Sequence, residues 1–290
     1  MLFGMFVLTS TVWAAPPLIT VFVSILPQEY VVKKIAGDTV NVVTMIPKGS
    51  EPVTYEPKPS QMRELTTAKT YFSIGVPFEK TWIPKVRASN KALRIISVDV
   101  GIHKIPIQNH TCETEGYGHS HGEKNKEMLD PHIWLGPACM KTIAKNTYNG
   151  LIQLVPQNKE LYRKNVNAFL KEIDELNRTL RAEVKKMPPD AAFMVFHPAW
   201  GYFANEYGLE QIAIEIEGKE PKPAQLKNVI QTAKNHHIKV IFIQPQFSQK
   251  TAQLVADAIG AKILVADPLE KNWAENLRRQ TIQFRKAVQP

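Results

Sequence analysis

The stretch TVFVSILPQEYVVKKIAGDTVNVVTMI, residues 20–46, decides the fold class. Residues 20–25 and 39–46 are short runs rich in apolar and β-branched side chains, which are typical of strands. Residues 28–35 between them indicate a helix that Gly37 closes. Two strands separated by a helix form a βα unit, so the stretch predicts an α/β protein with a mostly parallel sheet.

The same alternation continues along the chain and then repeats. Further strands are expected at residues 71–74, 94–98, 193–196, 211–214, 240–243 and 263–265. Further helices are expected at 60–68, from about Ala138 onward, and at 223–236 and 248–259. The sequence therefore predicts two α/β lobes, each with a mostly parallel sheet flanked by helices.

A long amphipathic segment separates the two halves. Its apolar residues recur every three or four positions, as on one face of a helix: Tyr162, Val166, Phe169, Ile173, Leu176, Leu180, Val184 and Met187. Asn158 is the expected N-cap and Pro188 the stop, which gives a helix of about 45 Å. We expect a rigid brace between the lobes, with an ordinary long helix inside one domain as the alternative. The expected boundaries are 15–152, 153–189 and 190–290 for the first lobe, the connecting helix and the second lobe.

The N-terminus has the pattern of a secretory signal peptide. Residues 1–15 are uncharged and mostly apolar, and Val12-Trp13-Ala14 forms a cleavage site, so we expect a signal peptide over residues 1–14. A buried first strand or helix is the alternative, and the missing basic residue leaves the true start open. No cysteine follows the cleavage site, so the expected product is a soluble periplasmic protein without a lipid anchor.

Composition restricts the other function classes. The chain has 36 basic and 27 acidic residues, a net charge of +9, but the basic residues are spread along amphipathic segments. We interpret the excess as a solvated surface and expect no nucleic-acid partner.

Two histidines and an aspartate lie next to apolar runs. His132 lies in Asp130-Pro131-His132-Ile133-Trp134-Leu135, His197 follows residues 191–196, and Asp267 follows residues 262–266. Side chains at the carboxyl ends of buried parallel strands are where open α/β sheets bind ligands. Imidazole and carboxylate groups suit zinc, so these three residues predict a zinc site between the lobes, although each histidine could be purely structural.

The neighbouring sequence adds possible contributors to this site. Three aromatic residues, Trp134, Trp200 and Tyr202, are expected to shield it from water. The polar loop 103–127 carries further metal-binding side chains, among them His110, Cys112, His119 and His121. This loop is either a weak metal contact or a surface insertion, and Cys112 and Cys139 form either a disulfide or free thiols.

The motifs together resemble the zinc/manganese solute-binding family, in particular the periplasmic zinc-binding protein of a metal-uptake ABC transporter. They are GSEPVTYEP at 49–57, GVPFE at 75–79, DPHIWL at 130–135, HPAWGYF at 197–203 and DPL at 267–269. The resemblance implies two lobes joined by a rigid helix, with the metal in the cleft between them. It also implies a monomer that captures zinc and delivers it to a membrane permease.

The resemblance assigns three metal ligands and leaves one position open. His132, His197 and Asp267 match family ligands, whereas Val53 stands where the family has its first histidine. Water, a loop histidine (His119 or His121) or a glutamate (Glu51 or Glu56) could fill the position, in that order of preference. Alternatively, Val53 packs in the interior and tight binding is lost. Because manganese members tend to have glutamate at the position of His197, the resemblance implies zinc, with manganese or another divalent metal less favoured.

We expect a binding protein rather than an enzyme. Three protein ligands and a water are also the arrangement of a catalytic zinc, so a zinc-dependent hydrolase is the alternative. The chain has no His-Glu-x-x-His motif, however, and no general base placed by a motif. A scaffold or adhesion protein that kept the fold without the metal is a third interpretation.

Overall fold

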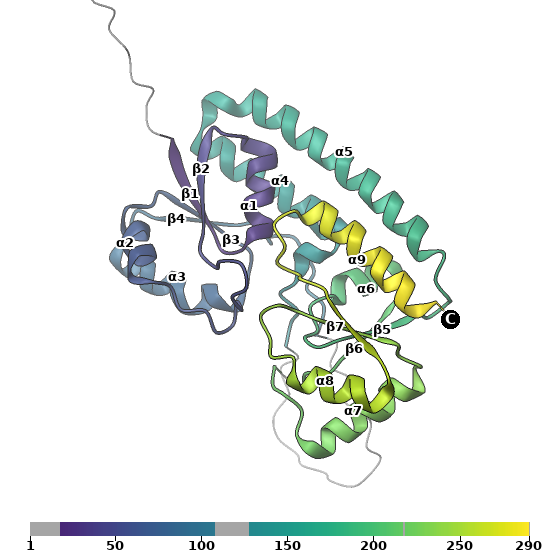
Figure 1. The fold of residues 1–290 in the computed structure, drawn as a ribbon. Helices are drawn as coiled ribbons and strands as arrows, with labels where there is room; N and C mark the ends of the chain where they lie inside the picture. Colours follow the sequence, from purple (N-terminus) through teal and green to yellow (C-terminus); the bar gives the residue numbers. More distant parts are fainter. Residues whose placement is uncertain (1–17, 108–127, 217, 290) are drawn as a thin grey trace, which may run out of the picture.

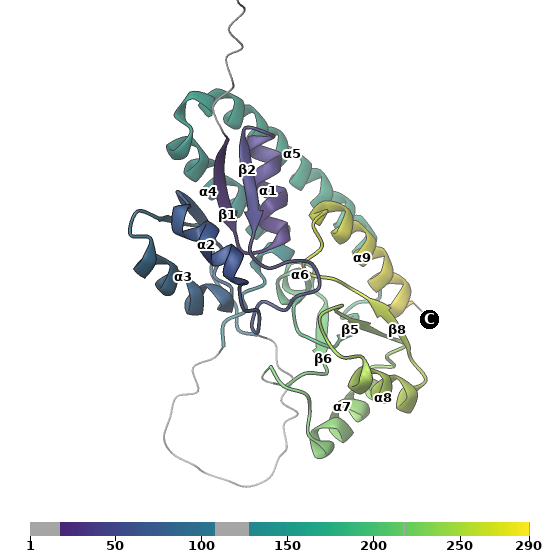
Figure 2. The same cartoon turned by 60° about the vertical axis from the view of Figure 1, so that its left-hand side comes forward.

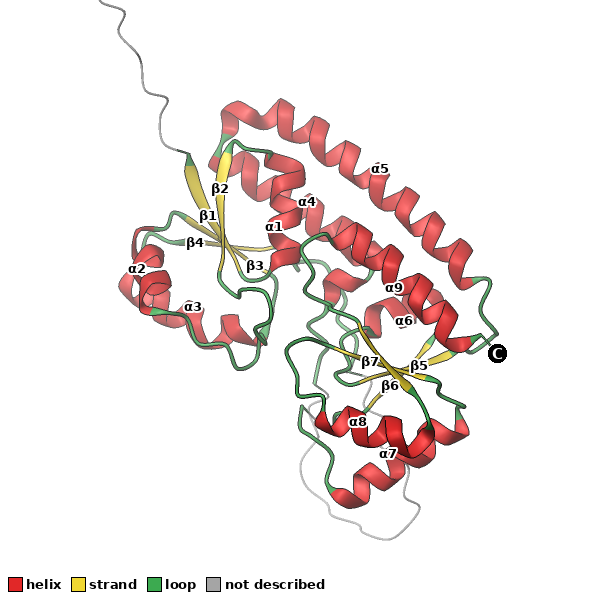
Figure 3. Ribbon diagram, in the orientation of Figure 1, coloured by secondary structure: helices red, strands yellow, loops and turns green. Residues whose placement is uncertain are grey.

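The protein contains two parallel sheets of four strands each, with helices on both faces (Figure 1, Figure 3). The computed structural model describes residues 18–107, 128–216 and 218–289. The expected signal peptide and most of the histidine-containing loop lie outside these residues. No helix in the described ranges is long and apolar enough to cross a membrane.

The first sheet forms the N-terminal lobe. Its strands are β1 Ile19–Val23, β2 Val40–Thr44, β3 Thr70–Ser73 and β4 Arg94–Ser97, in the order β2-β1-β3-β4. Four helices accompany it: α1 Leu26–Ala36, α2 Pro59–Thr67, α3 Pro77–Ser89 and α4 Pro137–Leu154. Helices α1 and α4 lie on the side of the sheet that faces the long helix α5 (Lys159–Val184), and α2 and α3 lie on the opposite side (Figure 1, Figure 2).

The second sheet repeats this plan in the C-terminal lobe. Its strands are β5 Ala192–Val195, β6 Glu210–Ala213, β7 Val240–Ile243 and β8 Lys262–Val265, in the order β6-β5-β7-β8. Its helices are α6 Gly201–Tyr207, α7 Pro223–Asn235, α8 Lys250–Ile259 and α9 Trp273–Val288. Side chains alternate between two hydrophobic cores along β5 and the residue after it. Phe193 and Val195 belong to a core shared with the first lobe, whereas Met194 and Phe196 belong to a second core that includes residues of α7 and α8.

Helix α5, Lys159–Val184, runs along both lobes and packs on α1, α4 and α9 (Figure 1). Its 26 residues span about 39 Å, somewhat less than expected because the helix ends before Met187. All six residues from Tyr162 to Leu180 on the predicted apolar face are buried. Asn158 occupies the N-cap position but makes no side-chain capping bond. The predicted two-lobe α/β fold with a long connecting helix is confirmed.

One element behaves differently from the sequence expectation. Strand β8, which precedes Asp267, was expected to be buried, but Leu264 and Val265 are exposed. The strand lies at the sheet edge and pairs only with β7 among the described strands. Its apolar side chains therefore reflect β propensity more than burial.

Candidate metal site

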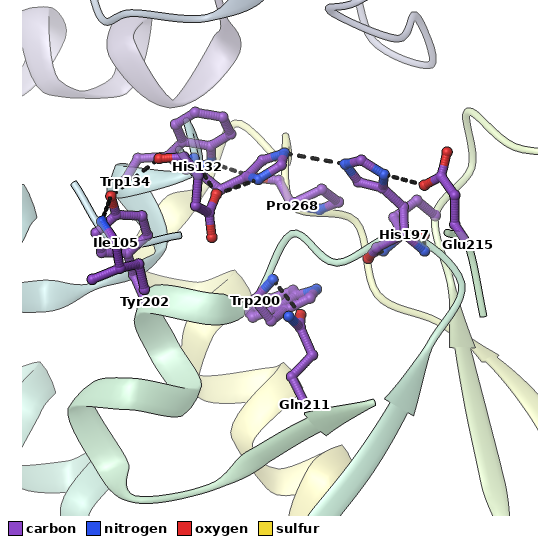
Figure 4. A network of polar contacts seen from close by, with 11 residues as sticks. Ile105, His132, Trp134, His197, Trp200, Tyr202, Gln211, Glu215 and Pro268 are labelled. Carbon is purple, nitrogen blue, oxygen red and sulfur yellow. Dashed lines mark hydrogen bonds and ion pairs between the residues drawn. The ribbon is translucent and has the colours of Figure 1, made fainter. Parts of the chain in front are cut away.

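The two predicted histidines meet where the lobes join (Figure 4). His132 precedes a short 3-10 helix, Ile133–Leu135, that leads into α4. His197 lies two residues beyond the end of β5, on the turn into α6. Their Nε2 atoms are 3.3 Å apart and the ring planes are inclined by 75°. Segments that are 65 residues apart in sequence thus point two imidazoles at one position.

Each imidazole is held from behind by a carboxylate. Nδ1 of His132 lies 2.7 Å from Oδ1 of Asp130, which also accepts the backbone N–H of His132 at 2.8 Å. Nδ1 of His197 makes a short contact with Oε2 of Glu215. A carboxylate on one ring nitrogen places the proton there and leaves Nε2 as the metal-binding atom.

This geometry fits a tetrahedral zinc ion. Two nitrogens at about 2.05 Å from zinc, separated by the tetrahedral angle, are about 3.3 Å apart, which matches the observed Nε2 to Nε2 distance. With both Nδ1 atoms protonated, two Nε2 lone pairs would face each other, an arrangement that a cation between them relieves. The donor pair therefore suits a metal bound by imidazole nitrogen.

A buried charge supports the same conclusion. Asp130 is fully buried, and its Oδ2 has no hydrogen-bond partner within the part of the chain that the structure describes. A buried carboxylate with one unpaired oxygen is costly unless a positive charge lies nearby. A metal ion on His132 would supply that charge through the ring.

The third predicted ligand stands apart from the histidines. Asp267 lies two residues beyond β8 and is 5% exposed. It does not form a metal-binding group with the two histidines, because the described residues contain no group of three or more His, Cys, Asp or Glu side chains that could hold a metal. Its Oδ1 accepts the N–H of Leu269 at 2.9 Å and Nε2 of Gln246 at 3.2 Å. The structure thus brings together His132 and His197, and Asp267 remains a predicted ligand.

The position of the missing family histidine is open to solvent. Val53 is 61% exposed, so the alternative in which it packs in the interior is wrong. Glu51 bonds within its own turn, where Oε2 accepts the N–H groups of Val53 at 2.7 Å and Thr54 at 2.9 Å. These bonds compete with any metal contact by Glu51. His119 and His121 lie outside the described residues.

Of the three expected aromatic residues, Trp134 contacts the histidine pair, whereas Trp200 and Tyr202 pack or bond around the loops that carry it. The ring of Trp134 packs edge-on against His132 at 5.3 Å, and Trp200 is buried beneath the turn that carries His197. Burial raises the pKa of Tyr202 to about 12, so its hydroxyl keeps its proton and donates to the carbonyl of Asp130 at 3.1 Å. These contacts fix the loop of His132 (Figure 4).

Cys139 lies in α4 and is half-buried. Burial, and then the nearby Glu206 and Asp130, raise the pKa of its thiol to about 11, which disfavours the thiolate needed for metal binding. The question of a disulfide with Cys112 stays open, because Cys112 lies outside the described residues.

Sequence reasoning missed the residues that support the ligands. Glu215 lies two residues beyond β6 and Gln244 one residue beyond β7. These are the same kind of position that identified His197 and Asp267. Extending the rule to every strand end would have found both. Phe247 stacks on His197 at 5.0 Å and 19°, and no motif pointed to it.

Residues 21–287 match the family described as ZnuA, zinc-uptake complex component A, periplasmic. The high-affinity zinc uptake system protein ZnuA of Bacillus subtilis is 31% identical over 240 residues, 82% of this chain and 74% of the relative. The zinc-binding lipoprotein AdcA of Streptococcus pneumoniae is 30% identical over 85% of this chain, which spans about half (49%) of that protein.

Solved structures agree with these sequence matches. A crystal structure of ZnuA superposes with a TM-score of 0.85 and 37% identity, covering 94% of this chain and 100% of the other. A deletion mutant of ZnuA with zinc bound gives a TM-score of 0.84 at 36% identity, with the same coverage of both chains. These relatives are named as zinc-uptake and zinc-binding proteins, in agreement with the prediction of a binding protein. The chain belongs to the zinc-uptake complex component A family of periplasmic metal-binding proteins.

Proposed function

We propose that this protein captures a zinc ion in the periplasm and delivers it to the permease of an ABC transporter. The observation that carries the proposal is the His132–His197 pair, with its Nε2 atoms 3.3 Å apart and a carboxylate on each Nδ1. Membership of the zinc-uptake family supports the transport role.

The ligand set that we propose is His132, His197 and Asp267, with water at the fourth position. Asp267 would join them through a shift of its side chain or its loop, since the described residues contain no group of three or more potential ligands that includes it. Two imidazoles and a carboxylate favour zinc over manganese, which prefers an oxygen-rich, octahedral environment. Bound zinc is cargo, and the open fourth position would let it exchange.

Calorimetry on chelator-stripped protein tests this proposal. We expect one zinc ion per chain with a dissociation constant below about 1 μM, which corresponds to more than about 8 kcal/mol. His132→Ala and His197→Ala should each weaken binding by more than about 100-fold, beyond the usual effect of losing an outer-shell partner. His103→Ala is the matched control, because His103 is exposed. Wild-type protein that binds no zinc under these conditions would contradict the proposal.

We further propose that residues 1–14 direct export and that no lipid anchor follows them. The uncharged apolar pattern of this segment supports export. The AdcA relative is named a lipoprotein, so the anchor needs its own test. Mass spectrometry of the exported protein should show an N-terminus at Ala15 and no added lipid mass.

A further inference from the structure

The segment that follows β7 contacts both the second histidine and the aspartate. Gln244 lies one residue beyond β7, and Gln246 and Phe247 come directly after the intervening proline. Side chains of these three residues reach His197 and Asp267, which belong to two other loops.

Two of its residues hold His197. Gln244 bonds the backbone of His197 twice, accepting its N–H at 3.2 Å and donating to its carbonyl at 2.8 Å. Phe247 stacks on the imidazole with centroids 5.0 Å apart. The backbone and the ring plane of His197 are therefore both fixed by the neighbouring strand.

The third residue acts on Asp267. Nε2 of Gln246 donates to Oδ1 at 3.2 Å, and the N–H of Leu269 donates to the same oxygen at 2.9 Å. Both hydrogen bonds to this carboxylate thus use Oδ1. Oε1 of Gln246 is buried without a hydrogen-bond partner among the described residues, so the bond to Asp267 is what orients this amide.

We propose that Gln246 is a specificity-determining positioning residue, which keeps Oδ1 of Asp267 occupied and presents Oδ2 alone to the metal. This inference rests on the proposed zinc-binding function and names what selects the ion at the same site. A carboxylate that binds through one oxygen suits four-coordinate zinc. Without Gln246, Oδ1 keeps only the N–H of Leu269 as a donor within the described part of the chain. It can then also approach the metal, and a carboxylate that binds through both oxygens favours the higher coordination number and oxygen-rich environment of manganese.

Gln246→Leu removes the donor while keeping a side chain of similar size. The matched control is Gln253→Leu in α8, because Gln253 donates to Asp257 at 2.7 Å in the same kind of bond on the exposed surface of the same lobe. Gln246→Asn is a second test variant that shortens the reach of the amide and keeps its polarity.

Three measurements are made on each protein: zinc and manganese affinity by calorimetry, the visible spectrum of the Co²⁺ complex, and the melting temperature without metal. In the Gln246 variants, zinc affinity should fall by about 10-fold or more, and manganese affinity should hold or rise. The zinc-to-manganese affinity ratio then drops, and the intense tetrahedral Co²⁺ bands weaken. Gln253→Leu should change neither the ratio nor the spectrum.

The possible outcomes separate this inference from the proposed function. An unchanged affinity ratio and Co²⁺ spectrum in both Gln246 variants would overturn the role of Gln246 while leaving zinc capture intact. If the zinc and manganese affinities fall by the same factor and the melting temperature drops, the role of Gln246 is merely structural, and the inference is also overturned. Wild-type protein that binds no zinc overturns the proposed function itself.

Discussion

Glu79 is a buried carboxylate in the N-terminal lobe whose titration should change the stability of the protein. It lies in the first turn of α3 and is 6% exposed. Its carboxylate accepts the N–H groups of Ile74 at 2.8 Å and Gly75 at 2.7 Å, together with a short bond from Ser24 Oγ. These three donors favour the charged form, but burial outweighs them and raises the pKa of Glu79 from 4.5 to about 7.

The shift fixes both the sign and the size of the effect. Because the folded pKa lies above the unfolded pKa, the folded state binds the proton more tightly, and this contribution to stability is complete below about pH 4.5. It is lost as the pH rises through 7. A shift of about 2.5 units corresponds to about 3 kcal/mol at 1.36 kcal/mol per unit. Glu79→Gln imitates the protonated carboxyl and should remove this pH dependence.

The measurement is urea unfolding of the wild type and of Glu79→Gln at several pH values from 4 to 8. Other titrating groups affect both proteins alike, so the difference between their free energies of unfolding isolates Glu79. We expect this difference to rise in favour of the variant by about 3 kcal/mol between pH 4.5 and pH 7. A difference that stays constant over this range would show that the three hydrogen bonds compensate for burial, and would refute the reasoning.

Three further substitutions probe the site and its surroundings. Gly201→Ala places Cβ 2.6 Å from Oδ2 of Asp130 and must displace this carboxylate, so calorimetry should show zinc affinity reduced by about 10-fold. Trp134→Phe deletes the bond from Nε1 to the buried carbonyl of Pro268, and urea unfolding should show a loss of about 1–3 kcal/mol. Val53→His restores the family's ligand, and we expect tighter zinc binding; unchanged affinity would mean that another group already fills the position.

The fold was largely predictable because its signals are local. All eight strands overlap predicted apolar runs, because β-branched and aromatic residues favour strands at buried and edge positions alike. Three helices were not anticipated: α3, α6 and α9. Pro84 lies inside α3, where a proline normally breaks a helix, and α6 has only seven residues. Tertiary packing, which a local pattern does not contain, stabilises these elements.

The site was predictable only in part because its geometry is not local. The end of a strand identified His197 and the Asp130-Pro131-His132 string identified His132, and the structure places the two histidines in contact. The carboxylate of Glu215 reaches His197 from the adjacent strand, and this pairing depends on the order of the strands in the sheet, which spacing along the chain does not give. The same limit applies to Asp267, whose approach to the histidines depends on loop positions.

The site geometry also bears on how the metal would enter and leave. The lobes share one hydrophobic core, and two indole hydrogen bonds of 2.7 Å link them: Trp134 donates to the carbonyl of Pro268, and Trp273 donates to the carbonyl of Trp134. A wide hinge motion would break both bonds and expose that core. The backbone of the loop that carries Asp267 is also held, because the carbonyls of Asp267 and Pro268 accept bonds from Asn276 and Trp134. We therefore expect metal exchange to depend on movement of the Asp267 side chain rather than on movement of the lobes.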